Sequence, residues 1–595
     1  MKENNQKLPR WDLSRLYKSV SDPKIKEDLA TYKKLTTNFA AKYKGKIAKL
    51  NAKEMFEMFE LLERLEKICI KLWRFFYLKE TENYKNIKVG SAKIHAQLQN
   101  IESNILFYKN EIVAIPENKL CSLLKNKKLR EYLPALKYLR RHRAHKVSDV
   151  IKNILSKKDE TSFTGWLRLY NQSFAKLRFR IGNKEYSNPE LWALFNKVNG
   201  KKRKEINNER QRVYADNADF FAYLYNMIIR DQKIEANIYK FDSILAKVNF
   251  DNQVDDKTVE LLLQTVNDSY KNISQRFFKL KARLLGVSKI PYWDAHLQLD
   301  LIQPKRYNWN EAKVIILSAY KEFSPELYKI VKNFFDNRVI DAEVRAGKRD
   351  TAFACPVPTI WGAYLSLQFT GTRSNVAVLA HELGHASHFT FLKQQKILNN
   401  NSSIFLCEVP STFGAFLTLR KLLDFVKSDL EKLEILMSQI QQMINDSLYT
   451  ALFHNFEIRA HQEINKGMIS AEHLAQIFQE ERSKYFGSTV NLMDKPNHEW
   501  LSFPTCFFHP CYCYSYSFAS GIVQSLYKVY QEKLVPDFEE KYLKLLSESG
   551  VKDYQELLKP FGLDVNQKDF WQKGLNLISD YLDEAEELSQ VVVLS

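Results

Sequence analysis

The sequence predicts a mostly α-helical protein with two lobes. Glycine and proline are scarce, with 17 and 16 residues in a chain of 595, which favours long helices over short strands joined by tight turns. Hydrophobic residues make up 45% of the chain, an ordinary share for a globular protein. The length exceeds what one hydrophobic core normally organises, so we expect at least two lobes.

The N-terminal third is predicted to be helical. Asp22-Pro23 marks a helix start, because Asp caps a first turn and Pro fits its first position. Apolar residues then recur at close to 3.6-residue spacing, namely Met58, Leu61, Leu62, Leu65 and Ile68, and again Leu133, Leu136 and Leu139. After residue 160 we expect a loop at 161–166, a strand at 177–181 and a helix from Asn188-Pro189. We therefore divide the chain into an N-terminal helical lobe, residues 1–195, and a second lobe, residues 196–595.

The second lobe is predicted to be helical around one strand-rich region. Long helices cover 205–335, whereas residues 337–370 are the most strand-like part of the chain. Residues 364–369 alternate in polarity and end at Gly371-Thr372. Such a strand could offer its edge to an extended peptide through main-chain hydrogen bonds. A helix begins near Phe405, with Pro410 expected in its first turn.

The most informative stretch contains His381-Glu382-Leu383-Gly384-His385, an H-E-x-x-H pattern. On a helix, His381 and His385 lie four residues apart on one face and can hold one metal ion between them. Glu382 is offset from that face by about 100°. It can therefore lean over the metal and take a proton from a water that the metal activates.

Residues 375–391 are predicted to form that helix. Apolar residues at helical spacing lie roughly opposite the two histidines, namely Val376, Leu379 and Leu383. Asn375 is the expected N-cap and Ser374 an alternative. A glycine inside a helix costs about 1 kcal/mol relative to alanine, so Gly384 indicates that another segment packs closely against this turn.

A third protein ligand is expected, because catalytic zinc usually has three and keeps one position open. Glu408 is the best candidate, at the start of the next helix and 23 residues beyond His385. Cys407 is its competitor and His388 a weaker one. Two His and one Glu suit zinc better than manganese or cobalt, and we expect one Zn²⁺ per chain.

At this point the chain resembles oligoendopeptidase F, the bacterial branch of the thimet oligopeptidase-like zinc metallopeptidases. The resemblance rests on the H-E-x-x-H helix, on Glu408-Val-Pro-Ser-Thr-Phe, on the aromatic run through Tyr514-Ser-Tyr516-Ser-Phe-Ala and on Trp11-Asp-Leu-Ser-Arg-Leu-Tyr. It implies a two-lobed helical zincin with a deep central channel and a small β-sheet beside the metal helix. The second lobe would be the catalytic one.

The resemblance also implies an activity, hydrolysis of peptide bonds in short oligopeptides, with folded proteins excluded by the narrow channel. The metal ligands would be His381, His385 and Glu408, and Glu382 the general base. The family's C-terminal tyrosine, which helps to hold the tetrahedral intermediate, best matches Tyr516. A neutral phenol beside zinc can stabilise a developing oxyanion. Further substrate-binding candidates from the same run are Tyr514, Tyr512 and His509.

Two positions depart from the family pattern. A second Glu usually follows the ligand Glu by seven residues, where this chain has Ala415. A His usually occurs early in the aromatic stretch, where this chain has Thr505. Loss of a residue that supports a metal ligand typically costs ten- to a hundredfold in affinity or activity, as an order of magnitude. The alternative function is therefore a catalytically weakened zinc protein that binds peptides.

Charge and cysteine content limit the binding partners and the cellular location that the sequence allows. The net charge is +19, which we assign to solvated helix faces; specific nucleic-acid binding would need a concentrated basic patch. The seven cysteines are scattered along the chain, and residues 1–5 show no signal peptide. We therefore expect a cytoplasmic protein. No apolar run of 18 residues occurs, so we expect no membrane span. Cys511-Tyr-Cys513 could bind metal, but without a matching pair we expect ordinary packing. No pattern in the sequence determines the oligomeric state.

Overall fold

A computed structural model describes residues 7–303, 305–357, 362–400, 402–493 and 497–594 of the chain. The N-terminal residues 1–5 on which the signal-peptide prediction depends lie outside this range. Contacts between residues divide the chain into two compact units, each assembled from three segments. The first unit comprises Met1–Ala144, Pro304–Phe425 and Val529–Leu563, and the second His145–Gln303, Val426–Lys528 and Asp564–Ser595. The predicted lobes, 1–195 and 196–595, were consecutive ranges, and that division stays a prediction.

The first unit is helical around one small sheet. Its helices are α1 (Pro23–Tyr43), α2 (Ala52–Glu82), α3 (Tyr84–Glu102), α4 (Phe107–Ala114), α5 (Glu117–Leu123), α6 (Lys127–Arg130), α7 (Leu133–Arg141), α15 (Trp309–Phe323), α16 (Pro325–Asp336), α17 (Arg373–Leu392), α18 (Ile404–Phe425), α24 (Phe538–Glu548) and α25 (Tyr554–Leu558). The chain starts α1 as predicted, with Asp22 accepting a hydrogen bond from the Lys24 backbone and Pro23 in the first turn.

The sheet of the first unit lies against α17. It has the order β4-β6-β5, with β4 (Ile340–Asp341) parallel and β5 (Phe353–Val357) antiparallel to the central β6 (Gly362–Ser366). Both β5 and β6 contact α17, so the small sheet beside the H-E-x-x-H helix is confirmed. The strand predicted at 364–369 is present as β6, which begins earlier, at Gly362, and ends at Ser366. It lies between β4 and β5 and is paired on both sides. The expectation that this strand offers an edge to a peptide is therefore wrong.

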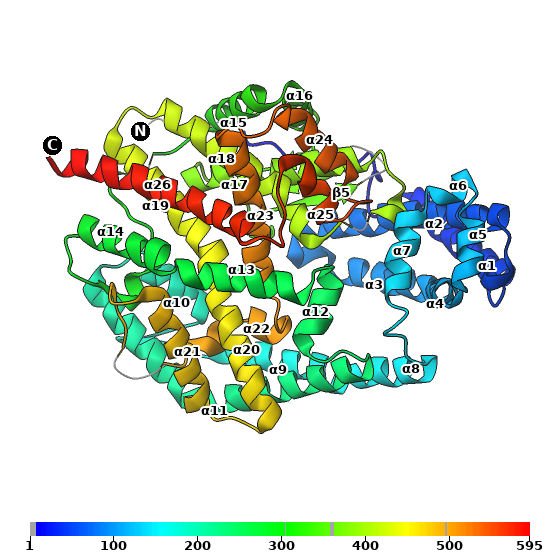
Figure 1. The fold of residues 1–595 in the computed structure, drawn as a ribbon, viewed down its shortest axis with the longest axis horizontal. Helices are drawn as coiled ribbons and strands as arrows, with labels where there is room; N and C mark the ends of the chain where they lie inside the picture. Colours follow the sequence, from blue (N-terminus) through cyan, green and yellow to red (C-terminus); the bar gives the residue numbers. More distant parts are fainter. Residues whose placement is uncertain (1–6, 304, 358–361, 401, 494–496, 595) are drawn as a thin grey trace. The chain divides into compact units, whose positions relative to one another are not determined.

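The second unit is also helical. Its helices are α8 (Asp149–Lys158), α9 (Phe163–Lys176), α10 (Asn188–Phe195), α11 (Gly200–Ile238), α12 (Ile244–Asn252), α13 (Asp256–Ser269), α14 (Arg276–Leu284), α19 (Asp429–Ile444), α20 (Thr450–Lys466), α21 (Ala471–Phe486), α22 (Thr505–Phe508) and α26 (Lys568–Leu594), and α23 (Tyr514–Gln531) continues into the first unit. The long C-terminal α26 packs on α19 and α13 (Figure 1). Two short strand pairs complete it, β1 (Phe179–Ile181) with β2 (Lys184–Tyr186) and β3 (Ile290–Pro291) with β7 (Val490–Asn491).

Two local predictions are wrong in the same way. Residues 163–166 are the start of α9 and not a loop. Gly165 in that turn allows a close approach, since a Cβ there would lie 2.9 Å from the Glu160 carbonyl oxygen. Pro410 lies in the interior of α18 and not in its first turn. In both cases a residue that disfavours helices is retained at a close backbone contact, which is with the preceding Glu160 for Gly165 and with Gly384 of α17 for Pro410.

None of the described helices is both long and apolar enough to cross a membrane. The seven cysteines are all free.

Candidate metal centre and active site

The helix that carries the candidate metal ligands is α17, and its start is fixed by a reciprocal cap. The N-cap is Thr372, whose hydroxyl accepts from the Asn375 backbone at 3.1 Å. The Asn375 side chain in turn accepts from the backbone of Thr370 and of Thr372, at 2.8 and 3.3 Å. Asn375 and Ser374 were the predicted caps, and both lie inside the helix. The reason is that an Asn in the third position can satisfy the free N–H groups before the helix, as the acidic residue of a capping box does.

Helices α17 and α18 lie side by side and pack more extensively on one another than on any other described element (Figure 1). Gly384 makes this possible, because a Cβ there would lie 2.2 Å from the Pro410 carbonyl oxygen and 2.6 Å from the Ser411 Cα. The predicted close packing against Gly384 is thus confirmed, and its partner is the backbone of α18. Glu408 lies two residues before Pro410, so this contact sets its distance from the histidines.

The two helices bring three ligand atoms together. One donor atom each of His381, His385 and Glu408 lies within 4.8 Å of the other two. The Glu408 Oε2 atom is 3.5 Å from His381 Nε2 and 3.6 Å from His385 Nε2. The side chains are 34%, 15% and 43% exposed respectively, so the cluster opens to solvent on one side. A three-ligand set with an open side is the arrangement of a catalytic metal site.

Ser411 supports Glu408 and was missed at the level of sequence. Its hydroxyl lies 3.0 Å from Glu408 Oε2 and 2.9 Å from the Glu408 carbonyl oxygen. A Ser three residues after a ligand Glu on the same helix was the available signal.

The alternative third ligands, His388 and Cys407, are not part of the cluster. His388 is buried, with its Nε2 atom 2.6 Å from Ser549 Oγ, and Cys407 is half-buried beside Glu408.

Both histidines of the cluster are neutral at pH 7. Burial, and for His381 also the neighbouring imidazole, lowers the pKa of each to about 4. A neutral imidazole keeps a lone pair for a metal, whereas an imidazolium has none. The Cys407 backbone next to the His385 ring opposes this lowering of its pKa.

Glu382 is the buried carboxyl of the site. Its Oε2 atom has no hydrogen-bond partner in the described part of the chain, and the Ala354 backbone of β5 donates to this side chain. Burial, and secondarily the charge of Glu408, raises the pKa of Glu382 to about 8. A bound cation would lower this pKa. A carboxyl with one unpartnered oxygen beside a metal-ligand cluster can accept and return a proton.

The residues present therefore fit a zinc ion. The donors are two neutral imidazoles and one carboxylate, which is a known ligand set of catalytic zinc. The unpartnered Glu382 oxygen is the group that such a site needs next to its open position.

The aromatic candidates all belong to the second unit. Tyr516 is 45% exposed, and its ring lies 5.6 Å from that of Tyr512. Tyr514 is fully buried and its hydroxyl accepts from Asn252 at 2.9 Å, which is a packing environment. The His509 ring is exposed and 5.8 Å from Tyr512. The catalytic and substrate-binding roles of these residues stay predictions.

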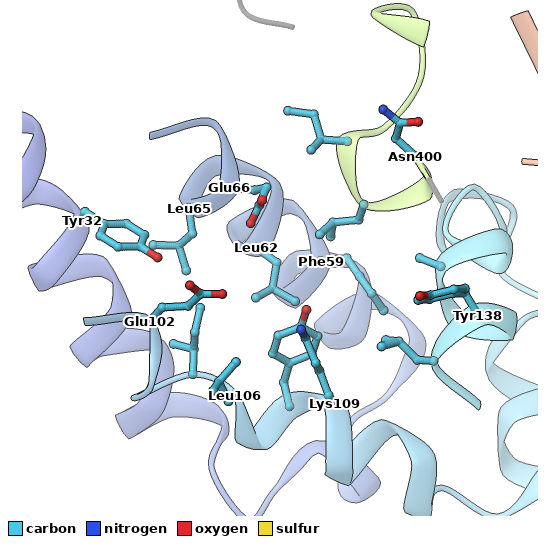
Figure 2. A pocket seen from close by; sticks show the side chains of 16 residues that line it. Tyr32, Phe59, Leu62, Leu65, Glu66, Glu102, Leu106, Lys109, Tyr138 and Asn400 are labelled. Carbon is cyan, nitrogen blue, oxygen red and sulfur yellow. The ribbon is translucent and has the colours of Figure 1, made fainter. Parts of the chain in front are cut away.

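A cavity of about 280 Å³ lies elsewhere in the first unit, between α2, α7 and the turn at Ile397–Asn399 (Figure 2). Its polar lining includes Glu66, Glu102 and Lys109. Burial, and next the charge of Glu102, raises the pKa of Glu66. None of the candidate ligands lines this cavity, so it is not part of the metal centre.

Comparisons with known proteins place the chain in a peptidase family. Residues 194–577 match the family model of peptidase family M3, and residues 111–179 match that of oligopeptidase F. The chain is similar to Oligopeptidase PepF of Bacillus subtilis, with 22% identity over 97% of this chain and 87% of that protein. It is also similar to an oligoendopeptidase F homolog of Borreliella burgdorferi, with 24% identity over 98% of both.

The fold is shared with solved structures. The crystal structure of oligoendopeptidase-F from Enterococcus faecium superimposes with a TM-score of 0.70, at 20% identity, over 95% of this chain and 98% of that one. The mostly helical fold predicted from the sequence is therefore confirmed. The family model covers well over half of the chain, and the H-E-x-x-H helix lies within the matched range. The chain belongs to peptidase family M3, as its resemblance to oligoendopeptidase F predicted, and is a metalloendopeptidase.

Proposed function

We propose that this chain hydrolyses peptide bonds in short oligopeptides, with one zinc ion held by His381, His385 and Glu408. The observation that carries the proposal is the convergence of these three ligand atoms within 4.8 Å beside the unpartnered carboxyl oxygen of Glu382. A zinc ion in such a site supplies a Lewis acid for the scissile carbonyl and brings the pKa of its water to about 7.

The chain's own residues supply the proton transfers and the alignment. Glu382 accepts a proton from the attacking water through its Oε2 oxygen and then returns it to the leaving amine. Ser411 holds the Glu408 carboxylate through its 3.0 Å contact, which keeps that ligand turned toward the two imidazoles. Tyr516 is proposed to donate its phenol proton to the oxygen of the tetrahedral intermediate.

The substrate class is proposed from two sources. Relatives that span nearly the whole chain are named as oligopeptidases, and the mixed sheet beside α17 can take an extended peptide along an edge by main-chain hydrogen bonds. We place the activity in the cytoplasm. No specific nucleic-acid partner is proposed.

The test is cleavage of quenched fluorescent peptides of several lengths, with and without a chelator, alongside a folded protein. We expect chelator-sensitive cleavage of the short peptides alone. The Glu382→Gln variant should keep its metal and lose turnover, and Glu408→Ala should lose the metal. Cys407→Ala is the matched control, since it removes the competing ligand next to Glu408 and should keep both metal and activity.

Two outcomes would contradict the proposal. Full activity of Glu382→Gln would exclude this residue as the general base. A wild-type protein that binds zinc and peptides without cleaving them would favour the peptide-binding alternative, which the departures at Thr505 and Ala415 motivate. Reversion of Thr505 to His and of Ala415 to Glu would then be expected to raise activity.

A further inference from the structure

The second unit contains another group of metal-ligating side chains that the peptidase chemistry does not use. Donor atoms of Glu457, Cys506 and Cys513 all lie within 4.8 Å of one another. Glu457 belongs to α20, Cys506 to α22, and Cys513 immediately precedes α23. The three residues are 0%, 1% and 0% exposed. Three potential ligands from separate elements thus meet in the interior.

The carboxyl of Glu457 is incompletely satisfied there. Its Oε1 atom accepts from the Cys511 backbone at 2.8 Å, whereas its Oε2 atom has no hydrogen-bond partner among the described residues. Burial raises the pKa of Glu457 to about 7, opposed by the Cys511 N–H and by the nearby thiols of Cys513 and Cys506. A buried carboxyl normally has a cation, a metal or a full set of donors, and thiols are only weak donors.

The surroundings hold this group in place. Cys511 has a backbone φ of 65°, a left-handed conformation that is uncommon outside glycine, and in this conformation its N–H is directed at Glu457. Its Sγ atom lies 3.4 Å from His461 Nδ1, and the other ring nitrogen of His461 is 3.1 Å from the Tyr225 hydroxyl. Neighbours of this kind orient the ligands of metal sites.

We propose that Glu457, Cys506 and Cys513 bind a second divalent cation of borderline-soft character, of which zinc is the commonest example. Tetrahedral zinc with bonds of about 2.3 Å to sulfur and 2.0 Å to oxygen would place the two sulfur atoms about 3.8 Å apart. The ligand atoms now lie within 4.8 Å of one another, so the two sulfur atoms need to approach by no more than about 1 Å to bind the ion. A water completes the four ligands, since the Cys511 Sγ atom contacts His461.

The charges balance for a buried site. Binding forms two metal–sulfur bonds and one metal–oxygen bond, and it releases to solvent both thiol protons and the carboxyl proton of any Glu457 that is protonated. The cation then faces two thiolates and one carboxylate, for a net charge of −1, which the Cys511 N–H partly offsets. The site is structural, because all its ligands are buried. It joins α20 to the segment between α22 and α23, which contains Tyr512.

Cobalt substitution tests the proposal, because the first site contains no sulfur ligand. The protein would be produced in zinc-depleted, cobalt-supplemented medium under reducing conditions. We expect two metal ions per chain in the wild type and a near-ultraviolet thiolate-to-cobalt charge-transfer band. The band should persist in Glu408→Ala, with one metal per chain, and disappear in Cys506→Ser and Cys513→Ser. Cys121→Ser, which removes an exposed thiol, is the matched control and should leave the band unchanged.

One metal per chain without a thiolate band in folded wild type would overturn the proposal, and this result needs no variant to fold. In Glu408→Ala, a strong chelator should lower the midpoint of thermal unfolding, and an unchanged midpoint would argue against a structural ion. The proposal is independent of the peptidase activity. An inactive protein that shows the band would contradict the proposed function alone.

Discussion

Replacement of Gly384 by alanine would test whether the contact between α17 and α18 sets the metal geometry. The added Cβ would lie 2.2 Å from the Pro410 carbonyl oxygen and 2.6 Å from the Ser411 Cα, whereas real Cβ atoms essentially never come closer than 3.0 Å. Both obstacles are backbone atoms, so no side-chain rotation relieves them. The two helices must therefore separate by about 1 Å, since packed interiors have few voids to absorb the difference.

A separation of the helices by about 1 Å is large compared with the distances between the metal-ligand atoms. Glu408 Oε2 lies 3.5 and 3.6 Å from the two imidazole nitrogens, so a shift of the backbone two residues later moves the carboxylate away from both. A misplacement of about 1 Å can cost roughly a hundredfold in rate. The effect on stability is smaller, because overpacking costs about 1–3 kcal/mol and alanine recovers about 1 kcal/mol of helix propensity.

The assay is peptide cleavage at buffered concentrations of free zinc, which reports the affinity of the active-site metal alone. We expect Gly384→Ala to need at least about tenfold more zinc for half-maximal activity and to unfold near the wild-type temperature. Gly200→Ala is the matched control, because its Cβ would meet only the Arg203 side chain, at 3.8 Å. Wild-type zinc dependence and activity in Gly384→Ala would refute the reasoning.

Three further predictions concern stability. His454 is buried with both ring nitrogens unpartnered among the described residues, and burial lowers its pKa to about 3. Below pH 6.5 the unfolded chain therefore binds a proton that the folded chain does not, and stability falls on acidification by about 1.4 kcal/mol per pH unit. Denaturant unfolding between pH 6.5 and 5 gives the slope of the unfolding free energy against pH. We expect this slope to be smaller in His454→Gln than in the wild type by up to about 1.4 kcal/mol per pH unit. Equal slopes in the two proteins would contradict the assignment to His454. Thr372→Ala removes the α17 cap and should cost about 1 kcal/mol, whereas Thr372→Ser should cost nothing measurable by the same method. Asp341 has two cationic partners, the Lys348 ammonium at 3.2 Å and the Arg345 guanidinium at 2.5 Å. Lys348→Met removes the first and should cost about 3 kcal/mol in the same unfolding experiment. A loss below about 1 kcal/mol would show that Arg345 alone suffices.

Much of the fold was predictable because helix signals are local. The start of α1 at Asp22-Pro23, the strand near Phe179 and the helix from Asn188 all follow from capping residues and side-chain periodicity within a few positions. The predictions failed at Gly165 and Pro410, where a residue that disfavours helices is kept for close backbone packing. At Pro410 the packing depends on a second segment, α17, which local patterns do not include. At Gly165 the close contact is with Glu160, five residues earlier.

The sequence by itself determined the family and placed His381 and His385 on one face of their helix, because a four-residue spacing on a helix does so whatever surrounds them. Only the tertiary structure decided which of the three candidate third ligands, Glu408, Cys407 or His388, lies beside them. Glu408 is brought within 3.6 Å by the contact of α18 with Gly384, while His388 is directed to Ser549. The same holds for the second cluster, since Glu457 lies about fifty residues from Cys506 and Cys513 in sequence and only the folded chain brings their ligand atoms within 4.8 Å of one another. Spacing along one helix is a property of the backbone, whereas a contact between helices depends on the packing of both surfaces.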